Sequence, residues 1–231
     1  MPSNGSGLPD SVRLPLVRSL AIFQLGESGG GTRLMRYVRR VVAGVQLADY
    51  ENAVSLFIEE EQYHSRLLAR LVQHLGGECL TGQWTNSVFR WLRNHFGVEF
   101  NIQVLLIAEL IAEAYFGSLY RKSSDKVLRA CCHKILSDEM RHIAFHAEFL
   151  RERLADKPAW WRTMWRGQFR LIHLATCVVV AWDHRGCFQA LGLKPANFAQ
   201  LALKAGSRFL RRLERPHTLW MARASVAEIS S

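Results

Sequence analysis

Glycine and proline are scarce within long stretches of this 231-residue sequence, which contains only 16 Gly and 6 Pro in all. No segment shows the alternation of Val, Ile and Thr, bounded by hairpin turns, that is typical of β-strands. These absences disfavour a β-rich fold, and the sequence predicts an all-α protein. An apolar fraction of 49% and a charged fraction of 22% also exclude general disorder.

The sequence also lacks a run of roughly 20 apolar residues, the length that a membrane-spanning helix needs. Its longest apolar stretches, such as Leu174 to Trp182, are much shorter. Met1 to Asp10 has neither the cationic nor the apolar region of a secretory signal. We therefore expect no transmembrane segment, and a flexible N-terminal tail over residues 1–11.

Cysteine is present in an odd number and without a Cys-x-x-Cys pair; the residues are Cys79, Cys131, Cys132, Cys177 and Cys187. This pattern is typical of reduced thiols rather than of a disulfide framework, so we expect a cytoplasmic protein. The formal charge of +10 would attract nucleic acid, an anionic membrane surface or an acidic protein, and does not choose among them.

Helical periodicity predicts four long helices, at about Leu14 to Val45, Ala48 to Leu75, Val98 to Arg121 and Asp125 to Leu154. The first contains Gly26 and Gly29 to Gly31, so either it breaks there or close packing demands glycine. Gly76 and Gly77 end the second helix. Ser123 to Asp125 supply a turn and a cap before the fourth.

A crossover that includes a short helix would join the second and third long helices, and two more helices follow at about Trp160 to Trp182 and Pro195 to Leu213. The second of these ends in a basic stretch, Arg208, Arg211, Arg212 and Arg215. We expect residues 12–156 to form one bundle and residues 157–231 to form a helical extension that packs on it.

Two of the long helices carry the same spacing, Glu-x-x-His, in Glu61 to His64 and in Glu139 to His142. Residues three apart share one helix face, so a carboxylate and an imidazole can bind the same metal ion. Both pairs continue apolar stripes and point inward, where an unpartnered carboxylate would cost several kcal/mol. The repeated motif therefore predicts a buried metal site.

The other two long helices offer few further carboxylates for such a site. Glu27 is the only acidic residue between Asp10 and Asp49, and it lies within about one helical turn of the level of Glu61. On the third helix the candidates are Glu109 and Glu113. The levels favour Glu109, and leave Glu113 as a neighbouring group or a ligand in one oxidation state.

With these residues the sequence resembles the ferritin-like di-iron carboxylate superfamily over about residues 14 to 154. The pattern of that superfamily is Glu, Glu-x-x-His, Glu, Glu-x-x-His along an up-down four-helix bundle. The resemblance implies two iron ions, with manganese as the alternative, and one or two bridging carboxylates. It implies as metal ligands Glu27, Glu61, His64, Glu109, Glu139 and His142.

The segment from Asp138 to His142 is similar to the Asp-Glu-x-Arg-His motif of bacterial di-iron monooxygenases. By that resemblance Asp138 would hydrogen-bond a ligand histidine, His64, and Glu60 would do the same for His142. The position where ribonucleotide reductase radical subunits carry a tyrosine, one turn beyond His64, is Leu68. A stored tyrosyl radical is therefore disfavoured.

Some histidines and aromatic residues have more than one interpretation. His146, one turn after His142, is either an additional ligand or, as the commoner case, a core histidine. His133, His173 and His184 have no comparable spacing and receive no role. The third helix and the C-terminal helices could shape a substrate pocket with Phe116, Trp161, Trp165 and Phe169.

A ladder of arginines, Arg162, Arg166 and Arg170, lies near three tryptophans, Trp160, Trp161 and Trp165. Such a pattern occurs on membrane-surface and nucleic-acid-binding faces. It is more common on a solvated helix edge whose tryptophans lie in the core. We expect the latter, and no nucleic-acid partner.

The resemblance implies a non-haem di-iron oxidase or oxygenase that uses O2 to oxidise a small organic substrate. An acidic ferredoxin-type protein could deliver electrons at the basic C-terminal face. The alternatives are a rubrerythrin-like peroxidase with Glu113 as an additional ligand, a ferroxidase or iron-binding protein, and a non-enzymatic helical interaction protein. Whether the chain forms a homodimer stays open.

Overall fold

The protein is described by a computed structural model that covers residues 7–29, 31–41, 47–95 and 98–214. Within these ranges every regular element is a helix, which confirms the all-α prediction. In chain order the helices are α1 (Asp10–Glu27), α2 (Thr32–Val41), α3 (Leu47–His74), α4 (Trp84–His95), α5 (Val98–Lys122), α6 (Lys126–Ala155), α7 (Ala159–Asp183), α8 (Arg185–Ala190) and α9 (Pro195–Glu214).

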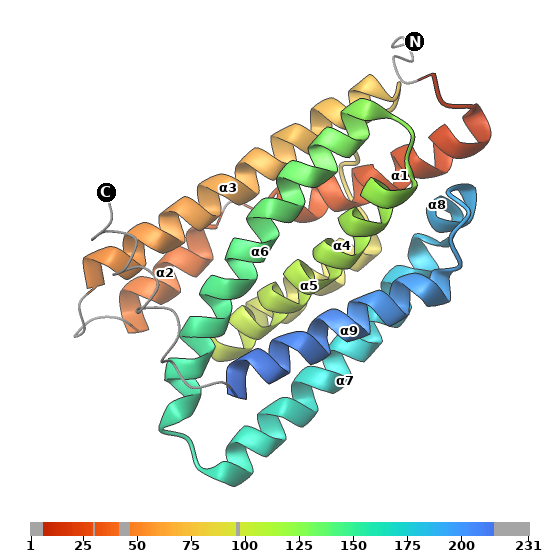
Figure 1. The fold of residues 1–231 in the computed structure, drawn as a ribbon. Coiled ribbons are helices and arrows are strands. Elements are labelled where there is room, and N and C mark those ends of the chain that lie inside the picture. Colours follow the sequence, from red (N-terminus) through yellow and green to blue (C-terminus); the bar gives the residue numbers. More distant parts are fainter. Residues whose placement is uncertain (1–6, 30, 42–46, 96–97, 215–231) are drawn as a thin grey trace, which may run out of the picture.

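Helix α5 lies at the centre of the arrangement. It packs against α6 and α9, while α3 packs against α6 and α1, and α7 packs against α9. Figure 1 shows α3 and α6 on one side of α5, and α9 and α7 on the other. The C-terminal helices therefore cover α5 mainly on the side opposite to α3 and α6, the helices that carry the Glu-x-x-His motifs.

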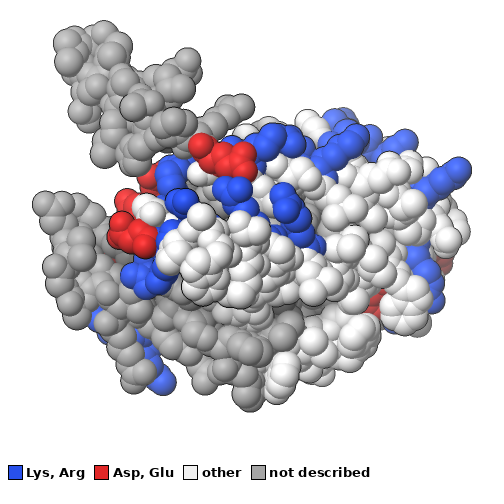
Figure 2. Space-filling view, turned by 90° about the horizontal axis from the view of Figure 1, so that it is seen from below, with Lys and Arg blue, Asp and Glu red and all other residues white. Residues whose placement is uncertain are grey.

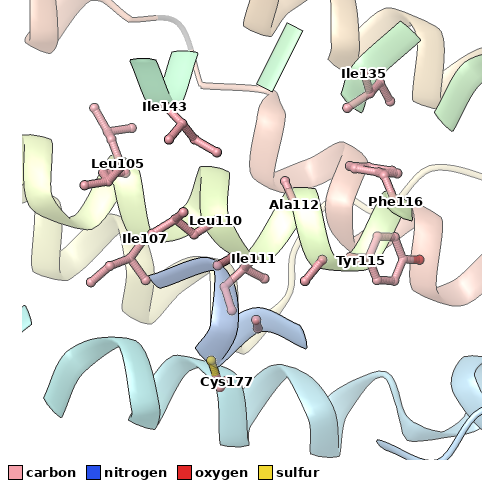
Figure 3. Packing of buried hydrophobic residues seen from close by; sticks show 14 of the residues in the cluster. Leu105, Ile107, Leu110, Ile111, Ala112, Tyr115, Phe116, Ile135, Ile143 and Cys177 are labelled. Carbon is pink, nitrogen blue, oxygen red and sulfur yellow. The ribbon is translucent and has the colours of Figure 1, made fainter. Parts of the chain in front are cut away.

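The side chains of α5 form the middle of the hydrophobic core. In Figure 3, Ile135 and Ile143 of α6 lie on one side of α5 and Cys177 of α7 on the other, near Ile111. The segment Phe100–Lys122 is long and apolar enough to cross a membrane, but 89% of its most apolar window is buried inside the protein. Its hydropathy is that of a core helix.

The predicted first long helix is two helices. The first of them, α1, begins at Asp10 rather than at the predicted Leu14. The N-terminal tail, predicted over residues 1–11, therefore ends before Asp10. The predicted helix breaks after Glu27 at the glycines, where Gly31 has φ of 62°, and a Cβ there would lie 2.5 Å from Ile58. Residues 1–6 of the tail, the predicted helix end at Val45 and Arg215 of the basic stretch lie outside the described residues.

The other predicted boundaries agree closely with the structure. α3 ends at His74 before the paired glycines, and Asp125 Oδ1 accepts a hydrogen bond from the Leu128 N–H at 2.7 Å to cap α6. α8 was not predicted, because six residues are too few to show helical periodicity. All five cysteines are unpaired, and burial raises the pKa of the Cys187 thiol to about 11.

Two glycines allow a matched test of packing between α7 and α9. A Cβ added at Gly206 would lie 2.4 Å from two ring atoms of His173, which is buried and stacks on Phe169. We expect Gly206→Ala to lower the free energy of unfolding by about 1–3 kcal/mol, because a buried ring that stacks on Phe169 would have to shift.

The control for that substitution is Gly167→Ala in α7, where an added Cβ meets nothing within 4 Å. There alanine should raise the free energy of unfolding by about 1 kcal/mol through its better helix propensity. Urea unfolding of both variants measures the difference. Equal effects of the two substitutions would show that the contact between Gly206 and His173 is not tight.

Candidate metal centre

Six acidic and imidazole side chains from four helices converge in the interior. Their ligand atoms form two overlapping groups, and within each group all lie within 4.8 Å of one another. One group is Glu61, Glu109, Glu139 and His142, and the other is Glu27, Glu61 and His64. The structure thus brings together all six residues that the sequence proposed as ligands, with Glu61 in both groups.

The position of each candidate ligand within its helix explains why its side chain reaches the cluster. Glu61 and His64 lie one turn apart on α3, and Glu139 and His142 lie one turn apart on α6, so each pair shares a face. Glu109 faces them from the buried side of α5. Glu27 is the last residue of α1, so the glycine break comes just beyond it and leaves it at the site.

Two carboxylates lie between the two imidazoles. Glu139 places Oε1 3.6 Å from His64 Nδ1 and Oε2 3.6 Å from His142 Nδ1. Glu61 Oε1 lies 3.7 Å from His64 Nδ1 and 3.3 Å from His142 Nδ1. Glu61 and Glu139 therefore occupy positions from which one carboxylate could bind two metal ions.

The opposite nitrogen of each histidine is held by a carboxylate outside the cluster. His64 Nε2 lies 2.9 Å from Asp138 Oδ2, and His142 Nε2 lies 2.8 Å from Glu60 Oε2. Carboxylates in this position fix the ring orientation and the tautomer of metal-binding histidines. Because this contact keeps the proton on Nε2, the Nδ1 atom of each ring has a free lone pair. Each Nδ1 faces the cluster and can bind a metal ion.

The Asp138 carboxylate accepts hydrogen bonds from two basic side chains besides its contact with His64. Lys134 Nζ donates to its Oδ1 at 2.7 Å, and Arg141 donates to the same oxygen at 2.6 Å. Burial alone would raise the pKa of the Asp138 carboxyl, but the hydrogen bonds from Lys134 and His64 outweigh it and lower the pKa. Asp138 therefore stays ionised and can keep the proton of His64 on Nε2.

The atoms that face the cluster lack protein partners. Glu61 Oε1, His64 Nδ1, Glu139 Oε2 and His142 Nδ1 are buried and make no hydrogen bond. Each unsatisfied buried polar atom costs about 1–3 kcal/mol, and here all four belong to residues of the two overlapping ligand groups. Metal ions would satisfy them all, and the mixed oxygen and nitrogen donor set suits iron or manganese. The residues fit a metal centre.

The electrostatics of the cluster agree with this fit. Burial, followed by the negative charge of neighbouring carboxylates, raises the pKa of Glu27 and of Glu139 well above the ordinary value. For Glu109, the close approach of Glu139 and of His142, whose Nδ1 lies 3.4 Å from Glu109 Oε2, outweighs the effect of burial and lowers the pKa. Without metal the acids must share protons, which divalent cations would displace.

Two neighbouring residues were proposed as additional ligands or supporting groups. Glu113 lies in neither group and forms an ion pair with Arg208 of α9. His146 is 2% exposed, and its Nε2 has no hydrogen-bond partner and lies 3.9 Å from Glu109 Oε1. Burial lowers the pKa of His146 to about 4, so it stands beside the cluster as a neutral imidazole.

A cavity of about 450 Å³ adjoins the cluster. Four of the clustered acids line it, namely Glu27, Glu61, Glu109 and Glu139, and the rest of its lining from α1, α4, α5 and α7 is mainly apolar. The aromatic residues that the sequence suggested for a pocket do not line it. Phe116, Trp165 and Phe169 are core residues instead, since each is at most 3% exposed.

Sequence reasoning missed a buried polar network at one end of this cavity. Ser19 Oγ lies 2.5 Å from Tyr115 Oη and 2.7 Å from His184 Nδ1, and His184 lines the cavity. Burial lowers the pKa of His184 to about 4. No local spacing could have revealed the network, because its members come from distant parts of the chain.

The contact between Asp138 and His64 gives a direct test of the cluster as a metal site. Asp138→Asn keeps the shape of the side chain but weakens its hold on the His64 Nε2 proton, so we expect metal affinity to fall about 10- to 100-fold. Glu59→Gln, at an exposed position of α3, is the control and should leave affinity unchanged. Competition titrations with a chromogenic chelator measure both, and equal affinities would contradict the role of Asp138.

Comparison with known proteins adds no family assignment. The sequence matches no family model, no curated protein and no solved structure.

Proposed function

We propose that the protein is a di-iron oxidase or oxygenase that uses O2 to oxidise a small, mainly apolar organic molecule. We further propose that α1, α3, α5 and α6 form a ferritin-like four-helix bundle around the metals. The observation that carries the proposal is the pair of histidines whose unsatisfied Nδ1 atoms face two shared carboxylates, Glu61 and Glu139. The Nε2 atom of each histidine forms a hydrogen bond with an acid, Asp138 for His64 and Glu60 for His142.

Iron in this cluster would be held by Glu27, Glu61 and His64 on one side and by Glu109, Glu139 and His142 on the other. When bound, a reduced iron pair supplies electrons for the reduction of dioxygen. The protein's part is to orient the ligands, and to hold protons on the His64 and His142 Nε2 atoms through Asp138 and Glu60.

The adjoining cavity supports oxidation of an organic substrate rather than iron storage. Its acidic wall carries four clustered carboxylates, so a molecule bound there would lie against the metals. The apolar lining from Ile22, Phe23, Leu105, Ile111 and Ile172 favours an apolar substrate and excludes water from the reaction.

The remaining candidates fit the structure less well. A rubrerythrin-like peroxidase would use a further carboxylate of α5, and Glu113 instead pairs with Arg208. A ferroxidase needs no apolar cavity beside its metals. A non-enzymatic interaction protein gives no reason for four buried polar atoms without partners.

The test is anaerobic reconstitution of the full chain with ferrous iron, followed by mixing with O2. We expect close to two iron ions per chain and O2 consumption that apolar organic molecules accelerate. Absence of stoichiometric iron or manganese would overturn the metal centre. Iron binding with O2 consumption that yields only ferric iron, and with no effect of organic molecules, would replace the oxygenase with a ferroxidase.

A further inference from the structure

Helix α7 exposes an apolar stripe along its whole length. Trp165, Phe169, His173, Cys177 and Ala181 are buried against the rest of the protein. The opposite face carries large apolar side chains that are 47–69% exposed, namely Trp160, Met164, Leu171, Leu174, Val178 and Trp182. Their spacing of three, four and seven residues places them on one face, about 33 Å long at 1.5 Å per residue.

The stripe continues onto α4 across the opening of the cavity. Trp84, Val88 and Trp91 of α4 are 48–54% exposed. Trp84 and Val88 line the cavity together with Leu171 and Ala175 of α7. Because these lining residues are themselves exposed, the cavity reaches the surface between the two apolar faces.

The charged side chains of α7 are basic except for Asp183, its last residue. The chain from Lys157 to Trp182 contains Arg162, Arg166 and Arg170 but no Asp or Glu. Arg162 and Arg170 are exposed, and Arg166 pairs with Glu214 at 2.9 Å. Figure 2, which views the molecule from the side of α7, shows a broad area without charged residues, with mostly Lys and Arg and some Asp and Glu at its edges.

Cations also stand over the aromatic rings near both ends of α7. Lys157 Nζ lies 5.5 Å from the ring centroid of Trp161, and the Arg185 guanidinium lies 4.7 Å from that of Trp182. Tryptophan next to Arg or Lys is the composition of protein surfaces that sit at the headgroup level of a bilayer.

We propose that this face, consisting of the exposed stripe of α7 and the exposed residues of α4, docks on the surface of an anionic lipid bilayer. The helices lie parallel to the membrane, with the apolar side chains among the acyl chains and Arg170, which flanks the stripe at about 100° per residue, at the lipid phosphates. Arg162 and Arg166 lie further round the helix and add to the positive charge near the membrane. The core helix α5 stays inside the protein, so the contact is peripheral. In the docked protein the opening of the cavity faces the bilayer. An apolar molecule could then pass from the bilayer into the cavity without crossing water.

A second copy of the chain fits this face less well than a membrane does. An isologous dimer through α7 would bring together two chains that each carry a formal charge of +10. An anionic bilayer instead complements that charge and accepts the apolar stripe. Exposed apolar patches of this extent on soluble proteins mark interaction surfaces.

Vesicle co-flotation of the full-length protein tests the proposal. The protein should bind vesicles of phosphatidylcholine with about 30% phosphatidylglycerol and bind pure phosphatidylcholine more weakly. The double variant Trp160→Ser/Trp182→Ser should reduce binding about tenfold, because both indoles leave the interface. Arg162→Gln/Arg170→Gln should also reduce it and should weaken its dependence on salt.

Matched controls lie on other faces. Met140→Ser, at a residue of α6 that is 65% exposed, and Arg70→Gln, at an exposed residue of α3, should leave binding unchanged. Circular dichroism confirms that each variant folds, which is expected because the substituted side chains are exposed. Vesicle binding requires neither metal nor substrate, so this result is independent of the proposed oxygenase activity.

Three outcomes would overturn the proposal. The first is a wild-type protein that does not bind anionic vesicles. The second is binding that the arginine variant loses but the tryptophan variant keeps, which would reduce the contact to charge alone. The third is a wild-type dimer in light scattering that the tryptophan variant converts to a monomer, which would assign the face to a second copy.

Discussion

Replacing Glu61 with alanine is expected to abolish the metal binding that we propose for the cluster. Glu61 belongs to both groups of clustered ligands, and its Oε1 lies within 3.7 Å of both histidine Nδ1 atoms. Its loss leaves Glu27 and His64 as one pair and takes a shared carboxylate from the other group. We expect the affinity for ferrous or manganous ion to fall by about 100-fold or more, since a direct ligand matters more than its supporting residues.

The matched control is Glu113→Ala on α5. Glu113 was the alternative ligand on that helix, and its carboxylate pairs with Arg208 instead of facing the cluster. Metal analysis after reconstitution and gel filtration should find full occupancy in this control and almost none in Glu61→Ala. If both variants kept their metal, the cluster would not be the binding site. If both lost it, Glu113 would contribute in a way that its ion pair does not suggest.

The composition of the cluster could be predicted because its signals are local or exclusive. The two Glu-x-x-His motifs depend only on the spacing of a helix, and Glu27 was the single acid that the first helix offered. Even the preference for Glu109 over Glu113 rested on counting residues from a turn. The structure brings Glu109 to the cluster and pairs Glu113 with Arg208.

Features that depend on contacts distant in sequence could not be predicted. The bond from Ser19 to His184 joins residues 165 positions apart, and neither has a motif. Two of the helices expected to line a pocket, α5 and α7, do line the cavity. The aromatic residues expected in its lining do not, because periodicity does not say which aromatic residues of a helix fill the core. The break after Glu27 was an open alternative, since glycine permits either a turn or close packing.

Helix α7 shows the same difficulty at the surface. Its arginine ladder and tryptophans were interpreted as a solvated edge with core tryptophans. Trp165 is indeed 3% exposed, but Trp160 is 66% exposed. Neighbouring tryptophans of one helix thus face opposite ways, and only the position of α9 decides which of them is covered.

Acid should destabilise the protein through His173, a residue far from the metal cluster in sequence and on a different helix. Burial between α7 and α9 lowers its pKa from 6.5 to about 4. Between these values the unfolded chain binds a proton that the folded protein does not, so stability falls as the pH falls. The contribution is intact above pH 6.5, and up to about 3 kcal/mol of it is lost by pH 4.

The variant His173→Gln removes this titration, so its stability should change less between pH 7 and pH 4 than that of the wild type. The comparison concerns the change with pH rather than the absolute stability, because glutamine also alters the packing on Phe169 and Gly206. Both proteins keep the same cluster of Glu and His side chains, so the pH dependence of that cluster cancels in the difference. Urea unfolding at several pH values provides the measurement.

The exposed His133 of α6 supplies the matched control, since His133→Gln should leave the pH dependence of the wild type intact. His184 is buried with a pKa also near 4, and it should add a second, separate contribution, because it bonds to Ser19 and does not touch His173 in any described contact. A double variant of His173 and His184 should then be the least sensitive to acid. A contradicting result would be a His173→Gln variant whose stability depends on pH as strongly as that of the wild type. Protonation of His173 would then not destabilise the folded protein, and the interface between α7 and α9 would be less tightly packed than the contact with Gly206 requires.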